Sequence, residues 1–166
     1  AHEIDGDTVS FEHIRHAAHR QLIRQLQNLG DVVAVNHPQT EVDALAKKAR
    51  RRGKNAVFIC CTPPQWLPQH IQCPTIAVFA WGFNTIPTES FGNHLRHDWR
   101  DVFKTCIGAI TFSDYARAAV NATMGPAFPV CVVIPAIENA TAVGMNALHF
   151  RPCAAGMLHA SLHGCI

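Results

Sequence analysis

The sequence lacks any long apolar run, although 48% of its 166 residues are hydrophobic. No stretch approaches the roughly 20 consecutive apolar residues that a helix needs to span a bilayer. The N-terminal sequence AHEIDGD has neither the basic start nor the apolar core of a signal peptide, and it has no initiator methionine. We therefore expect no transmembrane segment, and the missing methionine is compatible with a processed or excised fragment.

The sequence also has little net charge. Its 14 Lys and Arg residues nearly balance its 12 Asp and Glu residues, which gives a formal net charge of +2. Such a balance supplies no large field to attract nucleic acid or an anionic membrane, so no nucleic-acid partner is predicted. The basic run at residues 47–52 is interpreted as the solvated end of a helix, where cations complement the helix dipole.

A complete set of paired cysteines is excluded because the chain has 7 cysteines, an odd number. Cys60 and Cys61 lie in an apolar run, where a free thiol behaves as a small hydrophobic side chain. Free thiols are typical of a reducing compartment, so the predicted localisation is cytoplasmic. A nucleophilic pair of Cys61 with His37 is an alternative, since both are expected at strand ends, but nothing local activates the thiol and a structural role is preferred.

No Cys-x-x-Cys motif accompanies the histidines near the C-terminus. Two of these histidines have a spacing that would place both rings on one face of a helix. The candidate metal ligands are Cys153, His159, His163 and Cys165. Their spacing matches no zinc finger, and the 11 His of the chain are scattered, so neither a metal nor a cofactor is predicted.

What the sequence does contain is an alternation of helical and strand patterns. Apolar positions advance by threes and fours from Phe11 to Leu29, which predicts an amphipathic helix with Ser10 as its N-cap. Further helices are predicted at residues 40–52, 98–106 and 114–124. Short apolar runs rich in β-branched residues predict strands at residues 31–36, 55–61, 75–81, 108–113 and 130–134.

Turn and capping residues punctuate these elements. Thr40 is the expected N-cap of the second helix, and Gly53 is expected to stop it. Ser113 or Asp114 can cap the helix that ends near Gly125.

Continuous apolar strands favour a parallel sheet that is buried on both faces. The fold class predicted is α/β: a Rossmann-like three-layer sandwich with a mostly parallel central sheet. We expect one domain over residues 10–137, an N-terminal segment over residues 1–9, and an irregular or partly helical tail over residues 138–166.

The loops after the predicted strands carry aromatic and polar side chains. In an open parallel sheet these loops meet at one edge, where ligands bind. They are His37-Pro38, residues 62–66, Trp81-Gly82-Phe83-Asn84, Ser113-Asp114-Tyr115 and Pro135. Rings beside hydroxyl, amide and carboxylate groups suit a sugar or another amphipathic small molecule, and they also suit other polar ligands.

The loop after residues 75–81 is the most distinctive of these. Gly82 is expected to turn the chain with a positive φ and to let a ligand approach the backbone. Trp81 and Phe83 would flank the opening, and Glu89 would reach back toward it; the alternative for Glu89 is a solvated loop carboxylate. Truncation of Trp81 should then weaken ligand binding and spare the fold, whereas Gly82→Val should strain the backbone. The alternative for Trp81 is simple packing at the edge of the sheet.

Three segments carry a family resemblance. They read "PTIAVFAWGFNTIPTESF", "DWRDVFKTCIGAITFSDYARAAVNATMG" and "PVCVVIPAI". In this order, over about residues 55–137, they resemble the N-terminal half of a retaining glycosyltransferase of the GT-B architecture, in the family 4 group.

The resemblance implies a domain that binds a sugar or glycan acceptor, with a nucleotide-sugar donor held by a C-terminal domain that this sequence does not contain. It implies Glu89 as the catalytic residue. The implied acceptor-binding residues are Trp81, Gly82, Phe83, Thr85, His94, Ser113 and Tyr115. The sequence departs from the family pattern at Gly82, where an acidic residue is common, and no glycine-rich loop precedes Phe11. We therefore expect the isolated chain to transfer no sugar.

The alternative from another class is a non-catalytic α/β domain that binds a small molecule or regulates a partner. The same edge of the sheet would serve that role.

Overall fold

The computed structural model of the chain describes residues 20, 22–90, 97–133 and 150–151. The predictions for residues 1–9, for Ser10, for His94 and for the Cys/His-containing tail lie outside these residues.

A five-stranded sheet of order β1-β2-β3-β4-β5 forms the centre of the described fold. Neighbours from β1 to β4 pair in parallel, whereas β5 pairs antiparallel with β4. The strands are β1 (Phe58–Cys60), β2 (Thr75–Val78), β3 (Gly108–Thr111), β4 (Val130–Val133) and β5 (Phe150–Arg151). Every residue of β2, β3 and β4 is buried, which explains why their sequences are apolar runs without alternation.

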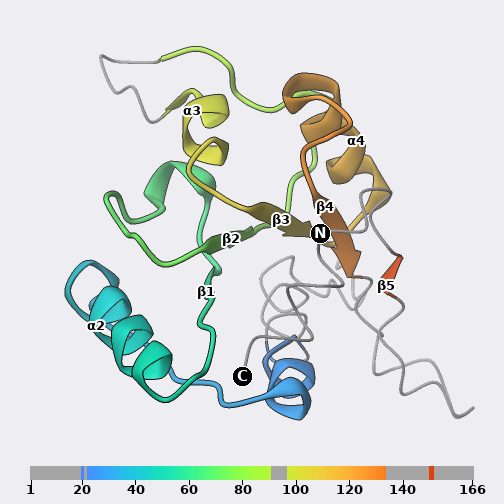
Figure 1. Ribbon diagram of the computed structural model, residues 1–166. Helices are drawn as coiled ribbons and strands as arrows, with labels where there is room; N and C mark the ends of the chain where they lie inside the picture. Colours follow the sequence, from blue (N-terminus) through green and yellow to red (C-terminus); the bar gives the residue numbers. More distant parts are fainter. Residues whose placement is uncertain (1–19, 21, 91–96, 134–149, 152–166) are drawn as a thin grey trace, which may run out of the picture.

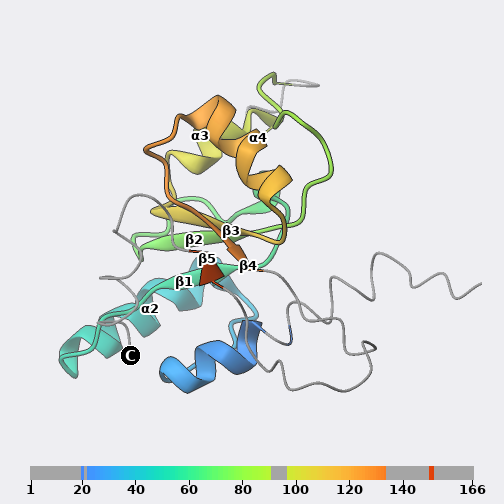
Figure 2. The same cartoon turned by 90° about the vertical axis from the view of Figure 1, so that its right-hand side faces the viewer.

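One face of the sheet is covered by η1 (Pro64–Trp66), α3 (Trp99–Phe103) and α4 (Asp114–Met124). On this face Ala77 and Phe79 pack with Trp99 and Phe103 in one apolar cluster. Figure 2 shows α3 and α4 together on this side of the sheet, as expected when successive parallel strands are joined by crossovers of one hand.

The opposite face is covered by the helix at residues 22–29 and by α2 (Pro38–Arg51). Leu22 is buried with Ile76, Val78 and Ile110 in a second apolar cluster. The α2 helix buries Val42 and Ala46 against Cys73 in a third. The described residues therefore form three layers, and the predicted α/β Rossmann-like fold with a mostly parallel sheet is confirmed (Figure 1).

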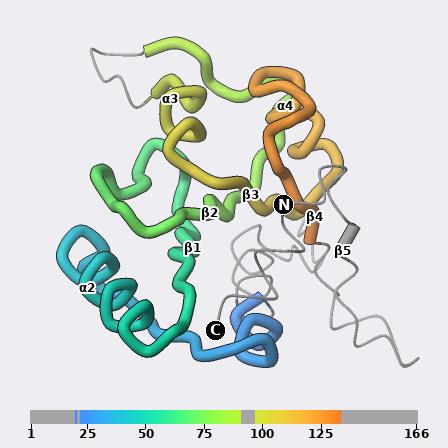
Figure 3. The backbone as a smooth tube through the Cα atoms, in the orientation of Figure 1, coloured from blue at the N-terminus to red at the C-terminus, as the bar shows by residue number. Residues whose placement is uncertain are grey.

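The strand predicted at residues 31–36 is wrong. This segment has no strand hydrogen bonding and runs as an extended link from the helix at residues 22–29 into α2 (Figure 3). Its β-branched composition suggested burial, yet Val32 and Val33 are 43% and 63% exposed. A β-branched composition leads to a strand only where a neighbouring strand pairs with the segment and other layers bury it.

The α2 helix begins at Pro38, so Thr40 is not its N-cap. Proline suits the first helical position because its missing N–H would have no intrahelical partner there. The side chain of Glu41 then accepts hydrogen bonds from the backbone N–H groups of Asn36 and His37, at 3.4 and 3.3 Å. As predicted, Gly53 follows the end of the helix, with φ of +72°.

Other predicted elements are present with shorter bounds. The α4 helix is capped as expected, because the Ser113 hydroxyl oxygen accepts a hydrogen bond from the Ala116 N–H at 3.1 Å. Gly125, with φ of +89°, ends this helix. The α3 helix is only five residues long, and β1 and β2 end sooner than their apolar runs. In the described part of the chain, no helix has the length and apolar character needed to cross a membrane.

Candidate functional site

Trp81 lies in the loop that follows β2, and its ring is held by several contacts. The ring centroids of Trp81 and Trp99 are 4.4 Å apart, and those of Trp81 and Phe83 are 5.0 Å apart. The indole Nε1 donates a hydrogen bond to the carbonyl oxygen of Thr85 at 2.8 Å. Trp81 is half-buried against the apolar cluster beneath α3, so much of its ring packs on the protein itself.

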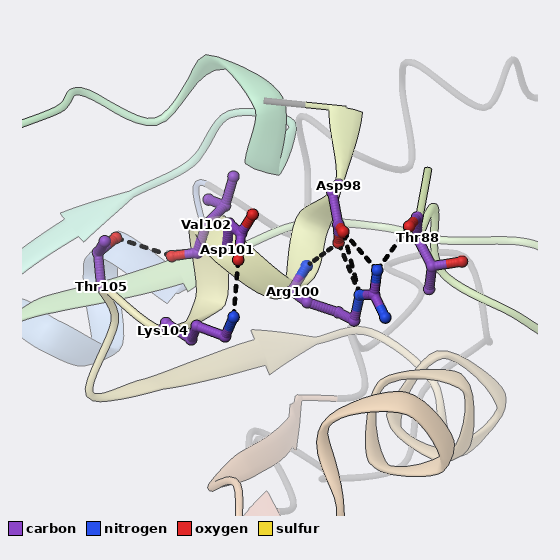
Figure 4. Close-up of polar contacts among 7 residues, drawn as sticks. All are labelled: Thr88, Asp98, Arg100, Asp101, Val102, Lys104 and Thr105. Atoms are coloured by element: carbon purple, nitrogen blue, oxygen red, sulfur yellow. Dashed lines mark hydrogen bonds and ion pairs between the residues drawn. The ribbon is translucent and has the colours of Figure 1, made fainter. Parts of the chain in front are cut away.

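The same loop is fastened to the start of α3 by hydrogen bonds from two consecutive residues. The Trp99 backbone N–H donates to the Pro87 carbonyl oxygen at 3.0 Å. The Arg100 guanidinium donates from Nη2 to the Thr88 carbonyl oxygen at 2.8 Å (Figure 4). The first residues of α3 therefore position the backbone of Pro87 and Thr88.

Arg100 is itself oriented by Asp98, the N-cap of α3. Its Nη2 and Nε atoms donate to the two carboxylate oxygens at 2.6 and 2.9 Å, a bidentate pairing (Figure 4). The hydrogen bond from Arg100 lowers the pKa of Asp98 from its ordinary value, because it stabilises the ionised carboxylate. A charged pair thus holds the loop at the rim of the sheet.

Beyond these anchors the loop presents side chains to solvent. Phe83 is 65% exposed although one side of its ring contacts Trp81. Thr85 and Glu89 are exposed as well. An exposed aromatic ring beside an exposed hydroxyl and a carboxylate can bind the apolar face and the polar groups of an amphipathic ligand.

Gly82 does not have the predicted conformation. Among the described glycines, only Gly53 and Gly125 have a positive φ. A Cβ atom placed on Gly82 meets no other atom within 4 Å. The expected strain in Gly82→Val is therefore wrong, since the loop leaves the sheet without a left-handed residue and has room for a side chain there.

At the end of β3, Ser113 is committed to capping α4 through its hydroxyl group. The buried hydroxyl of Thr111 donates to the Ser113 carbonyl oxygen at 3.2 Å, which fixes this turn. Tyr115, in the first turn of α4, is 53% exposed. Ser113 and Tyr115 thus follow β3 as predicted, while the loop at residues 81–89 follows the adjacent β2.

The end of β1 holds cysteines that are poor nucleophiles. The Cys60 sulfur and the Thr62 hydroxyl lie 3.2 Å apart. Burial of the sulfur and the neighbouring Cys60 raise the pKa of Cys61 to about 11, although part of the residue is exposed. His37 precedes α2 and does not follow a strand, so the basis for a Cys61–His37 pair is wrong.

Within residues 20, 22–90, 97–133 and 150–151, no group of three or more His, Cys, Asp or Glu side chains could hold a metal ion. This statement does not extend to the candidate ligands near the C-terminus.

Sequence reasoning missed the role of Arg100. The sequence Asp98-Trp99-Arg100 offered a signal, because an N-cap carboxylate and an arginine two positions later can share a bidentate pair. The direction of the Arg100 side chain toward Thr88 could not be read from spacing alone.

No protein-family model, curated protein or solved structure matches the chain. The case for a function therefore depends on the fold and on the geometry at the ends of the strands.

Proposed function

We propose that the chain is the acceptor-binding half of a glycosyltransferase-like enzyme, and that a sugar or glycan acceptor binds against the loop at residues 81–89. The observation that carries the proposal is the exposed ring of Phe83, supported from below by Trp81 at the carboxyl end of a parallel strand. This end of an open parallel sheet is the usual place for a ligand.

The loop has the properties of a preorganised binding surface. Its backbone carbonyl oxygens at Thr85, Pro87 and Thr88 each accept a hydrogen bond, which holds the loop in place. A rigid surface loses less entropy when a ligand binds than a mobile loop does. The ring of Phe83 supplies a stacking face for the C–H side of a sugar ring, and the Thr85 hydroxyl supplies a hydrogen bond.

In the proposed reaction the bond between the donor sugar's anomeric carbon and the diphosphate of a nucleotide sugar breaks. A bond forms between that carbon and an acceptor hydroxyl oxygen, and Glu89 accepts the hydroxyl proton. The nucleotide-binding half would be contributed by a further domain, so the chain alone would bind an acceptor and not transfer a sugar.

The test is saturation-transfer NMR of the purified chain against a panel of mono- and disaccharides. We expect at least one saccharide to bind, and Phe83→Ala to weaken it by about 1 kcal/mol or more, the usual cost of losing an aromatic contact. Ile107→Ala is the control, because Ile107 is a 41% exposed apolar side chain that immediately precedes β3, at the opposite end of the parallel strands.

Failure of every saccharide to bind, or an equal loss in the two variants, would overturn the proposal. A longer polypeptide that also contains a nucleotide-binding half distinguishes the proposed enzyme from the alternative, a non-catalytic binding domain. Saccharide binding without any transfer from nucleotide sugars by that longer protein would favour the binding domain.

A further inference from the structure

A surface away from the candidate site combines exposed apolar side chains with a run of cations. Its apolar part is Leu29, Val32 and Val33, which are 40%, 43% and 63% exposed. Its basic part is the end of α2 and the turn after it, where the following cations are exposed: Lys47, Lys48, Arg50, Arg51, Arg52 and Lys54. We call these residues together the basic–apolar patch.

A salt bridge joins the two parts. Lys54 Nζ lies 2.6 Å from the Asp31 carboxylate, which immediately precedes Val32. Lys54 and, less strongly, Arg52 lower the pKa of Asp31 from its ordinary value, in keeping with both cations being near it. The backbone N–H of Lys54 donates to the Ala49 carbonyl oxygen at 3.0 Å, which fixes this turn on the end of α2.

Within the part of the chain that the structure describes, Leu29, Val32 and Val33 belong to none of the three apolar clusters. Segment 31–36 has a composition typical of a buried strand, yet Val32 and Val33 are exposed and Val35 is only half-buried against the cluster of α2. Exposed apolar groups that lie together and are rimmed by charge mark an interaction surface more often than isolated ones do. Because cations lie beside these apolar groups, we expect a negatively charged partner.

We propose that the basic–apolar patch binds the surface of an anionic lipid bilayer. The cations would contact the headgroups, and Val32, Val33 and Leu29 would enter the interface between headgroups and acyl chains. The inference does not depend on the proposed function. It revises the expectation, based on the net charge of +2, that the chain has no field for such a membrane, because the positive charge is concentrated in one place.

Other partners fit this patch less well. Single-stranded nucleic acid is usually bound with aromatic side chains on which bases stack, and the patch residues are aliphatic or charged. A second copy of the chain would place the same cations against one another in a two-fold contact, which is unfavourable.

The test is co-sedimentation of the full chain with vesicles of phosphatidylcholine alone or mixed with phosphatidylserine. We expect binding only to the mixed vesicles, and weaker binding at high salt because the charges are screened. The double variant Arg50→Glu, Arg51→Glu should lose at least about fivefold in partitioning for each cation removed. The variant Val32→Ser, Val33→Ser should also weaken binding at unchanged net charge.

The control is Lys104→Glu, a single charge reversal at the C-cap of α3, at a side chain that is 68% exposed. It should bind the mixed vesicles much more strongly than the α2 double variant does. Circular dichroism of every variant confirms that each is folded. Equal binding to both kinds of vesicle, an equal loss in the control, or lipid-independent self-association abolished by Val32→Ser, Val33→Ser would overturn the proposal.

Discussion

At the scale of the residue, Trp81 is both a neighbour of the candidate site and a packing residue. Its ring contacts the buried Trp99, and its indole nitrogen is hydrogen-bonded to Thr85. The sequence-based expectation that Trp81→Ala spares the fold therefore changes. The exposed Phe83 is the better probe of ligand binding, because removing its ring disturbs less of the protein.

We expect Trp81→Ala to lower the free energy of unfolding by about 2–4 kcal/mol, since it removes a half-buried ring, its aromatic contacts and a hydrogen bond. Phe83→Ala should cost about 1 kcal/mol or less, because most of that ring faces solvent. Urea denaturation of both variants measures the difference. Equal losses would show that Trp81 is not the anchor of the loop.

At the scale of the element, a helix cap is the clearest link between one side chain and a segment. Ser113→Ala removes the hydroxyl that accepts from the Ala116 N–H, so unfolding should become easier by about 1 kcal/mol. Ser113→Asp keeps an acceptor at the N-cap and should retain most of the stability. Thermal unfolding of the two variants checks this, and an equal loss in Ser113→Asp would contradict the capping role.

Local sequence patterns were sufficient to predict the central strands, but not the link at residues 31–36. The runs in β2, β3 and β4 are apolar because central parallel strands are buried on both faces, so the sheet could be predicted. Segment 31–36 has the same pattern and is not a strand, since pairing depends on neighbours that a local pattern does not contain. The site was predictable at Ser113, whose cap is local, and not at Arg100, whose contact with Thr88 bridges a loop and a helix.

At the scale of the whole molecule, two surfaces with different chemistry lie on different layers. The loop after β2 is fastened to α3 on one face of the sheet, whereas the basic–apolar patch includes the end of α2 on the other face (Figure 2). If both proposals hold, an acceptor and a bilayer could be bound by the same domain without competing for the same residues. Variants in one surface should then leave the function of the other unchanged.

Stability of the whole chain should depend on acidic pH through its paired carboxylates. The pKa of Asp98 is lowered by its hydrogen bond with Arg100, and that of Asp31 by Lys54. A carboxyl group with a lowered pKa in the folded state stabilises the fold above its unfolded pKa, and this stabilisation is lost as the pH falls toward the folded value. The free energy of unfolding should therefore decline below about pH 4.

The contribution of the Asp98–Arg100 pair to this decline can be isolated by a double-mutant cycle. Asp98→Asn removes the titrating group, and Arg100→Met removes the cation that lowers its pKa, so each variant should show a shallower decline than the wild-type chain. The double variant should be no shallower than Asp98→Asn alone, because the two residues act through one pair. Urea unfolding at a series of acidic pH values measures the slopes. Slopes parallel to that of the wild-type chain in both single variants would show that the pair does not contribute to the acid dependence of stability.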